Sequence, residues 1–214
     1  MEIAKDWEEH FMATTNRIKP TNGTHESTET DGAGVMSGVK RLLHLDAGGK
    51  ITTLEQLFVE QLKDLFSAES QLIEALPKMA DAAFAPALKK GFKLHWKETK
   101  EHARRLEKIL NALGESAEGK TCKAMEGLVK EGNETISEDA SREVKDAALI
   151  AAAQRVEHYE IAGYGCVRTY ATLLGRKADA RVLATTLKEE AATDKKLTGA
   201  AQTLNLKPQR AVKK

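Results

Sequence analysis

The chain has 214 residues, of which 30% are charged and 5% aromatic, and its formal net charge is +1. This near-neutral charge gives no support to a nucleic-acid partner, and no apolar run approaches the roughly 20 residues that a membrane-spanning helix needs. The acidic start lacks the hydrophobic segment of a secretory signal, and the two cysteines, Cys122 and Cys166, lack metal-ligand spacing. We therefore expect reduced thiols in a cytoplasmic protein with a helical fold and solvated outer faces.

Residues 1–50 differ in composition from the remainder of the chain. From Ala13 to Gly38, the residues are mostly Thr, Gly, Asn, Ser and Glu, which leaves almost nothing to bury. Such a composition is typical of disorder, so we expect a largely disordered N-terminal extension. A second interpretation is that the extension binds a partner.

The first long helix is expected to begin after Thr52 or Thr53, either of which can cap it, and to run to about Ala82 with a bend near Pro77. Glu69 lies at the centre of its apolar face. Three other carboxylates point away from this face and are expected to be surface charges: Glu60, Asp64 and Glu74.

A second helix is predicted from about Ala87 to Leu113. His95 and His102 lie two turns apart on its apolar stripe, and Glu98 lies at the border of the stripe between them. A histidine on an apolar face is more often a core residue than a ligand, but this stacked set also fits a metal site.

The segment from Gly114 to Val144 has weaker periodicity, and residues around Cys122 to Val129 indicate a short helix. Short links join antiparallel helices, whereas a crossover of this length allows the helices on either side of it to run in the same direction.

The third long helix is predicted from Asp146 to about Leu174, where Gly175 can cap it. Glu157 and Glu160 fall in the middle of its apolar stripe. His158 lies well off the stripe, and we expect it at the surface or at an interface.

The fourth long helix is predicted from about Lys177 to Leu204. Glu190 lies in the middle of its stripe with Asp194 one turn further on, whereas Glu189 falls off the stripe and is expected at the surface. Residues 206–214 form a basic tail, for which solvated disorder is the favoured interpretation and a weak anionic contact the alternative.

Each long helix thus brings at least one carboxylate to its apolar stripe or the border of that stripe. Unpaired buried carboxylates are costly, and a cluster of carboxylates with one or two imidazoles suits iron or manganese. The pattern predicts an all-α, ferritin-like four-helix bundle over residues 51–205, with one long crossover that contains a short helix and with two metal ions per chain. The alternative is a bundle without metal, whose inward carboxylates are protonated or paired with His95, His102, Arg105 and Arg168.

The chain resembles the YciF-like family of ferritin-like, rubrerythrin-like stress proteins over about residues 51–205. The resemblance rests on four strings: Asp146 to Gln154, Val156 to Ala162, Cys122 to Leu128, and Glu189 to Asp194. It implies a homodimeric bundle in the bacterial stress response and a ferroxidase activity that uses dioxygen or peroxide. The expected metal ligands are Glu69, Glu98, Glu157, Glu160 and Glu190, with His95, His102 and Asp194 as further candidates.

The sequence departs from the usual ferritin-like pattern, which carries Glu-x-x-His on two of its helices. The residue three after Glu98 is Glu101, and the residue three after Glu190 is Thr193. His102 and Asp194 come four residues on instead, so either another ligand such as His95 completes the site or one metal site is weak. A non-catalytic dimer with a partial metal site or none is therefore the second hypothesis.

Overall fold

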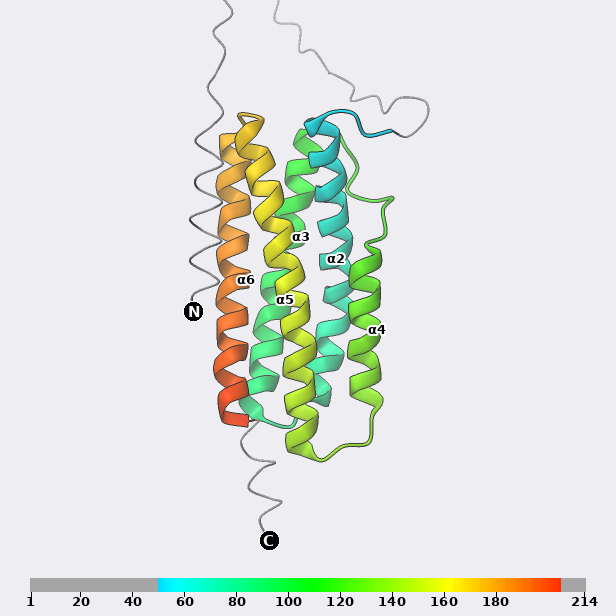
Figure 1. Cartoon of the computed structure of the whole chain (residues 1–214), viewed down its shortest axis with the longest axis vertical. Helices are drawn as coiled ribbons and strands as arrows, with labels where there is room; N and C mark the ends of the chain where they lie inside the picture. The colour runs from blue at the N-terminus through cyan, green and yellow to red at the C-terminus, as the bar shows by residue number, and fades with distance from the viewer. Residues whose placement is uncertain (1–49, 205–214) are drawn as a thin grey trace, which may run out of the picture. The chain divides into compact units, whose positions relative to one another are not determined.

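The computed structural model describes residues 50–204 (Figure 1). Five helices make up this part of the chain: α2 (Leu54–Ala82), α3 (Pro86–Ala112), α4 (Lys123–Ser137), α5 (Arg142–Leu173) and α6 (Lys177–Leu204). The predicted all-α class is confirmed for these residues, and none of the helices is long and apolar enough to cross a membrane. The expected extension, apart from residue 50, and the expected tail lie outside the described residues.

The four long helices form two antiparallel pairs, α2 with α3 and α5 with α6, and α4 packs outside against α2 and α5 (Figure 1). Residues 83–85 and 174–176 make the two short links. The long crossover through α4 lets α3 and α5 run in the same direction, as its length predicted.

The ends of the helices follow from local sequence. Thr53 caps α2, because its hydroxyl accepts a hydrogen bond from the Gln56 backbone N–H at 3.2 Å, and the Gln56 side-chain oxygen accepts one from the Thr53 backbone N–H. Pro86 occupies the first position of α3, where its missing N–H costs nothing. Gly175, with φ of 72°, directly follows Leu174, the C-cap of α5, in a conformation that favours glycine.

Helix α5 begins at Arg142, four residues before the expected start at Asp146. The difference arises because Lys145 and Asp146 are buried polar residues that break the apolar pattern. The Lys145 ammonium donates to the carbonyls of Thr135 at 2.9 Å and Ile136 at 2.8 Å near the end of α4. The Asp146 carboxylate accepts the backbone N–H groups of residues 84 and 85, both at 2.7 Å, and so holds the α2–α3 link against α5.

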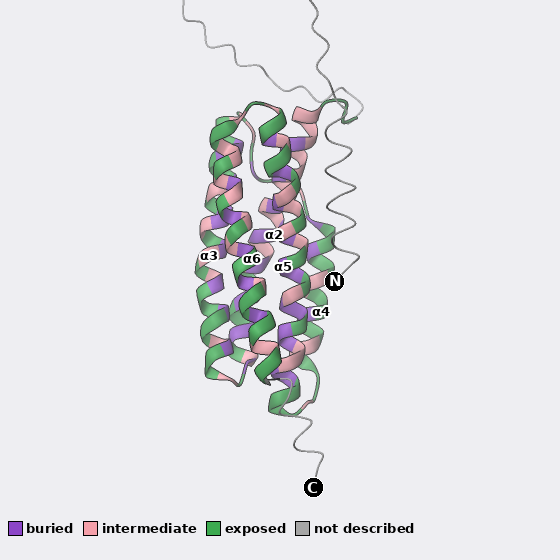
Figure 2. Ribbon diagram, turned by 60° about the vertical axis from the view of Figure 1, so that its left-hand side comes forward, coloured by how far each residue is buried: buried purple, intermediate pink, exposed green. Residues whose placement is uncertain are grey.

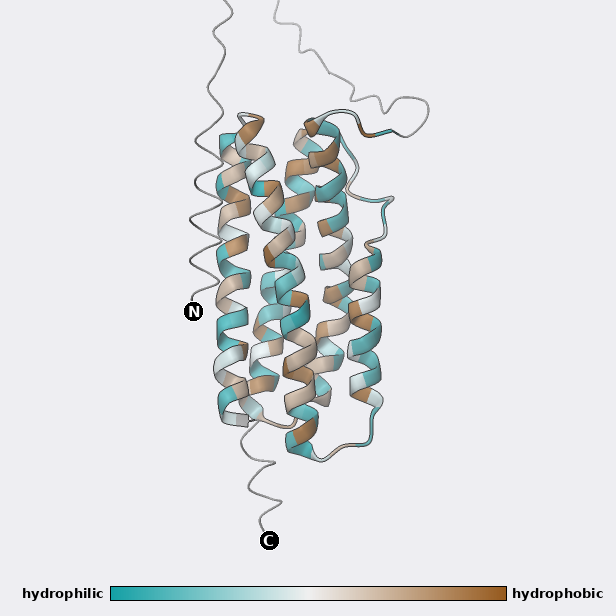
Figure 3. Ribbon diagram, viewed as in Figure 1, coloured by the Kyte–Doolittle hydropathy of each residue, from teal (hydrophilic) through white to brown (hydrophobic). Residues whose placement is uncertain are grey.

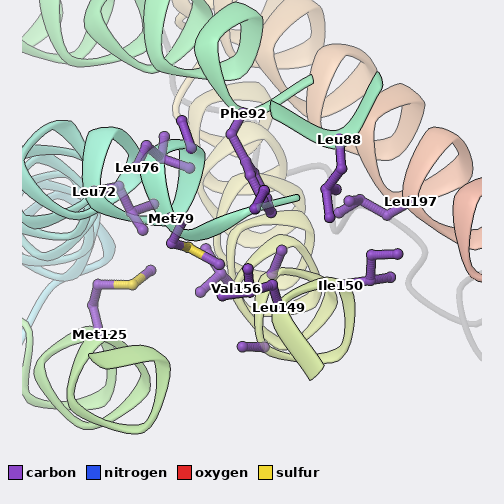
Figure 4. Close-up of a cluster of buried hydrophobic side chains, with 14 of the residues drawn as sticks. Leu72, Leu76, Met79, Leu88, Phe92, Met125, Leu149, Ile150, Val156 and Leu197 are labelled. Atoms are coloured by element: carbon purple, nitrogen blue, oxygen red, sulfur yellow. The ribbon is translucent and has the colours of Figure 1, made fainter. Parts of the chain in front are cut away.

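The interior of the bundle contains two buried apolar clusters, and Figure 2 marks the buried positions along the helices. The first, which we call the Phe92 cluster, includes Leu72, Leu76, Phe92, Leu149 and Leu197 (Figure 4). The second, the Tyr164 cluster, includes Phe58, Leu62, Leu106, Tyr164 and Leu183.

Between these clusters the core is polar. Apart from Lys145 and Asp146 at the start of α5, the buried polar residues of the long helices lie near mid-length, where residues of the Phe92 cluster give way to those of the Tyr164 cluster. Figure 3 shows this interruption on α5, where hydrophilic positions near the middle separate more hydrophobic stretches. The interior therefore has an apolar layer on each side of a polar one.

The two hydrogen bonds of Asp146 give a test of the packing at the α2–α3 link. Asp146→Ala leaves two backbone N–H groups without their acceptor, and we expect the free energy of unfolding to fall by about 1–3 kcal/mol. Chemical denaturation measures the change, and Asp139→Ala, at an exposed position close by, is the control, with an expected change within about 0.5 kcal/mol. Equal stability of the two variants would contradict the role of Asp146.

Candidate metal centre

The polar layer contains four carboxylates and two imidazoles, and all four long helices contribute to it. Its members are Glu69 of α2, His95 and His102 of α3, Glu157 and Glu160 of α5, and Glu190 of α6. We call these six residues the central cluster. Glu69, Glu160 and Glu190 have no exposed surface, and His95, the most accessible member, is 4% exposed.

The geometry divides the central cluster into two overlapping groups. One consists of His95, Glu157, Glu160 and Glu190, and the other of Glu69, His102 and Glu190. Within each group, one potential ligand atom per residue lies within 4.8 Å of all the others. Glu190 belongs to both groups, so its two oxygens are placed to bridge them.

Many polar atoms of the central cluster lack a hydrogen bond. Both oxygens of Glu160 and of Glu190, one oxygen each of Glu69 and Glu157, both nitrogens of His95 and Nδ1 of His102 are buried and form no hydrogen bond with a described residue. The two imidazoles do lie close to carboxylates of the cluster. Buried polar groups in proteins are nearly always satisfied. These oxygens and imidazole nitrogens come together from four helices. Such a set is expected where a cation binds, whereas a core without a cation would normally satisfy these atoms with hydrogen bonds.

His102 is held from its outer side by an ion pair. Its Nδ1 faces the central cluster, 2.7 Å from Oε1 of Glu190, while its Nε2 lies 3.0 Å from Oε2 of Glu189. Arg105 in turn donates to Glu189 through Nη1 at 2.5 Å and Nη2 at 3.3 Å. A carboxylate on the far nitrogen of an imidazole fixes the tautomer that presents the other nitrogen as a ligand.

His95 has a similar, looser arrangement. Its Nε2 lies 3.1 Å from Oε1 of Glu157 on the side of the central cluster, and its Nδ1 lies 3.6 Å from Oε2 of Glu98 on the outer side. The expected ligand Glu98 therefore lies behind His95, with a side chain that is 30% exposed.

Tyr164 completes the surroundings of Glu69. Its hydroxyl donates a hydrogen bond of 2.5 Å to Oε1 of Glu69, and both side chains are fully buried. The other oxygen of Glu69 has no hydrogen bond. Tyr164 thus fixes the orientation of the carboxylate and leaves one oxygen available.

Burial and crowding shift the pKa values of the cluster strongly. Burial raises the pKa of Glu157 to about 7 despite the neighbouring His95, and burial together with Glu69 and Glu190 raises the pKa of Glu160 well above its usual value. Burial lowers the pKa of His102, but the carboxylates of Glu190 and Glu69 outweigh it and raise the pKa to about 10. In the absence of a bound metal ion, protons on these carboxyl and imidazole groups therefore compensate the negative charge of the cluster.

Asp194, a further candidate ligand, and His158, expected at the surface or at an interface, both lie outside the central cluster. Oδ1 of Asp194 accepts a hydrogen bond from Gln154 at 3.2 Å and lies 3.3 Å from Nε2 of His158, at the outer seam between α5 and α6. His158 is exposed, as its position off the stripe predicted.

Two residues expected as plain surface charges have buried contacts instead. Glu189 is half-buried and contacts His102, and Asp64 accepts a 2.5 Å hydrogen bond from Tyr159, whose hydroxyl also lies 2.9 Å from Sγ of Cys122. Neither position lies on the apolar stripe of its helix. Helical periodicity therefore gave no signal for either contact.

Comparison with known proteins gives consistent matches over the bundle. A family described as a domain of unknown function, DUF892, matches residues 53–209. Protein YciF of Escherichia coli strain K12 is 45% identical over 150 residues, which are 70% of this chain and 90% of that protein.

Solved structures agree with this match. The crystal structure of the E. coli stress protein YciF has a TM-score of 0.71 at 44% identity and covers 73% of this chain and 99% of that one. YcfI of Rhodopseudomonas palustris, whose description suggests a structural protein, has a TM-score of 0.68 at 41% identity and covers 72% and 98%. A protein of Xanthomonas campestris at 17% identity and a TM-score of 0.61, over 76% and 100%, shares the fold.

The pKa shifts predict how pH changes the stability of metal-free protein. Folding raises the pKa of Glu157 from 4.5 to about 7 and that of His102 from 6.5 to about 10, so the folded state binds more protons than the unfolded state across this range. Stability should then fall as pH rises from about 5 to 9, by several kcal/mol. Chelator-treated protein, unfolded chemically at several pH values, measures this slope.

The matched control is Glu157→Gln, which should flatten the slope between about pH 5 and 7, where Glu157 contributes. A stability that rises over this range in the unsubstituted protein would contradict the assignment of trapped protons.

Proposed function

The chain belongs to the YciF-like family, described as DUF892. From this premise, we propose that it is a ferritin-like protein that binds two iron or manganese ions in the central cluster and oxidises Fe(II). The observation that carries the proposal is the set of buried carboxylate oxygens and imidazole nitrogens without hydrogen bonds. Four ionised carboxylates balance the charge of two divalent cations when both imidazoles are neutral. Bound cations would thus replace the protons on these residues. They would also remove the free-energy cost of burying polar atoms that have no hydrogen bond.

The donor types favour these metals. Carboxylate and imidazole ligands suit iron and manganese, and no cysteine belongs to either ligand group. Ferritin-like di-metal sites use four glutamates and two histidines, which is also the composition of the central cluster. Here the distribution differs, because α3 supplies both histidines and α6 supplies none.

Each residue has a role in such a centre. Glu157, Glu160 and His95 would hold one ion, Glu69 and His102 the other, and Glu190 would bridge them. Iron or manganese would supply one-electron chemistry toward dioxygen or peroxide. The chain itself orients the ligands through Glu189 and Tyr164, and burial keeps bulk water from the carboxylates.

The biological setting follows from the relatives. The E. coli relative is described as a stress protein, and we infer a cytoplasmic, homodimeric protein with a role in the stress response of its cell. Membrane and nucleic-acid partners are not part of this proposal, because the net charge is +1 and no described helix could span a membrane.

A second candidate function is a structural or interaction role without turnover, favoured by the description of YcfI from R. palustris. Both functions keep the bundle, but only the first needs metal. Stoichiometric metal in the purified protein and metal-dependent Fe(II) oxidation would favour the first, whereas a melting temperature unaffected by added Fe(II) or Mn(II) would favour the second.

The first prediction of the proposal concerns Glu190, which belongs to both ligand groups. Protein purified without chelators should contain about two metal ions per chain, and Glu190→Gln should lose most of both, since the amide keeps the shape but not the charge. Glu69→Gln should lose chiefly one ion. Elemental analysis and the rate of Fe(II) oxidation after anaerobic loading measure these effects.

Glu74→Gln, at an exposed position on α2, is the matched control and should keep the metal content and the oxidation rate. Unchanged metal content in Glu190→Gln would overturn the proposed site.

A further prediction concerns Glu189, which lies behind His102. Glu189→Gln should weaken metal binding by about 10–100-fold, because His102 loses the carboxylate that fixes its tautomer. Titration of apo protein with Mn(II) gives the affinity. Glu101→Gln, which removes a more exposed partner of Arg105, should leave it unchanged, and a similar loss in both variants would assign the effect to Arg105 packing instead.

A further inference from the structure

The Phe92 cluster does not fill its end of the bundle completely. A pocket of about 400 Å³ lies between α3 and α6, above a floor formed by α2 and α5. This volume is typical of sites for small organic molecules. Its walls are largely apolar and include Leu72, Leu76, Met79, Leu88, Phe92 and Leu197 (Figure 4).

The pocket reaches the central cluster. His95 and Glu157 line it, and both are buried side chains with at least one polar atom that lacks a hydrogen bond. Glu98, Thr193 and Lys196 line the same region, and Lys196 lies close enough to Glu98 to contribute to the lowered pKa of Glu98, behind the larger effect of His95. The pocket therefore has an apolar body and a polar end.

The pocket also opens to solvent. Gly91 and Leu94 on α3 and Lys196 and Thr203 on α6 line it and are exposed. Leu94 is 47% exposed, and a Cβ atom added at Gly91 would meet no other atom within 4 Å. The glycine thus leaves an opening on this side of the bundle.

Dioxygen, peroxide and hydrated metal ions need no apolar cavity of this size. Buried apolar walls without a partner forfeit dispersion contacts, and a ligand with a long apolar part would restore them. A polar head on that ligand would meet the unpaired groups at the inner end.

We propose that the α3–α6 pocket binds an unbranched, medium-length alkyl chain with an oxygen-bearing head group, its chain against the Phe92 cluster and its head toward His95. A fatty acid and a fatty alcohol share this chemistry. The binding requires no metal, whereas the consequence that the head group lies beside a metal centre rests on the function proposed above.

Isothermal titration calorimetry of the full-length protein with decanoate and with decanol tests the proposal. Saturable binding of either probe at one site per chain is expected. Gly91→Leu should weaken it by about tenfold or more, because the new side chain points into space that the ligand needs. Replacement of a helical glycine also favours folding, so the variant should be at least as stable.

The control is Gly127→Leu on α4, an exposed position without neighbouring atoms and outside the pocket, which should bind the probes like the unsubstituted protein. Ala200→Leu, on the α6 side of the pocket, provides a second obstruction if Gly91→Leu misfolds. Binding of neither probe, or equal binding by both obstructed variants and the unsubstituted protein, would overturn the proposal.

Lys196→Ala tests the orientation of the ligand and separates the two sources. A carboxylate head near Lys196 predicts a several-fold loss for decanoate and little change for decanol, and an unchanged affinity for decanoate would overturn this placement of the head group.

Metal content measured on the same samples separates this proposal from the proposed function. Probe binding by protein without stoichiometric metal would support the pocket and refute the metal centre. Protein that contains two metal ions per chain but binds neither probe would support the metal centre and refute the pocket.

Discussion

Carboxylates lose most of their hydration when they are buried, so several of them can share a protein interior only if cations or protons compensate their charge. The polar layer of this bundle places four glutamates under that constraint, with two histidines as their only imidazole neighbours in the two ligand groups. The apolar clusters on either side leave these side chains almost fully buried, so their charge has to be compensated. The stability of the middle of the bundle therefore depends on what occupies the central cluster.

The two histidines of the central cluster have different surroundings, and this difference affects how a ligand could reach the cluster. On its outer side, His102 contacts Glu189, which Arg105 holds in place, whereas the outer side of His95 has the longer contact with the partly exposed Glu98. His95 also borders the α3–α6 pocket, and His102 is enclosed beside Tyr164. One side of the centre is thus enclosed by side chains, and the other faces a cavity that opens to solvent. Any molecule that reaches the centre through this cavity would meet the side of His95 and Glu157 first.

In the proposed metal centre, the composition of a ferritin-like site is kept while the helix positions that supply its residues differ. Two histidines at a separation of two turns lie on the same face of α3, so one helix can serve both ligand groups. The inner position of α6 then needs only a bridging carboxylate, Glu190. The absence of the usual Glu-x-x-His pair on α3 and α6 is therefore compatible with a complete set of donors.

The sequence alone determined the helical class, the extents of the four long helices to within a few residues, and the inward direction of Glu69, Glu157, Glu160 and Glu190, because each of these depends on helical periodicity within one segment. It did not determine which borderline residues reach the cluster. Glu98 and Asp194 lie at the border of an apolar stripe and Glu189 lies off it, and the contacts of all three depend on the rotation and axial offset of neighbouring helices. Only the packing of α3 against α6 places Glu189 behind His102 and leaves the pocket beside His95, since both features arise from the distance between helices that are far apart in the sequence.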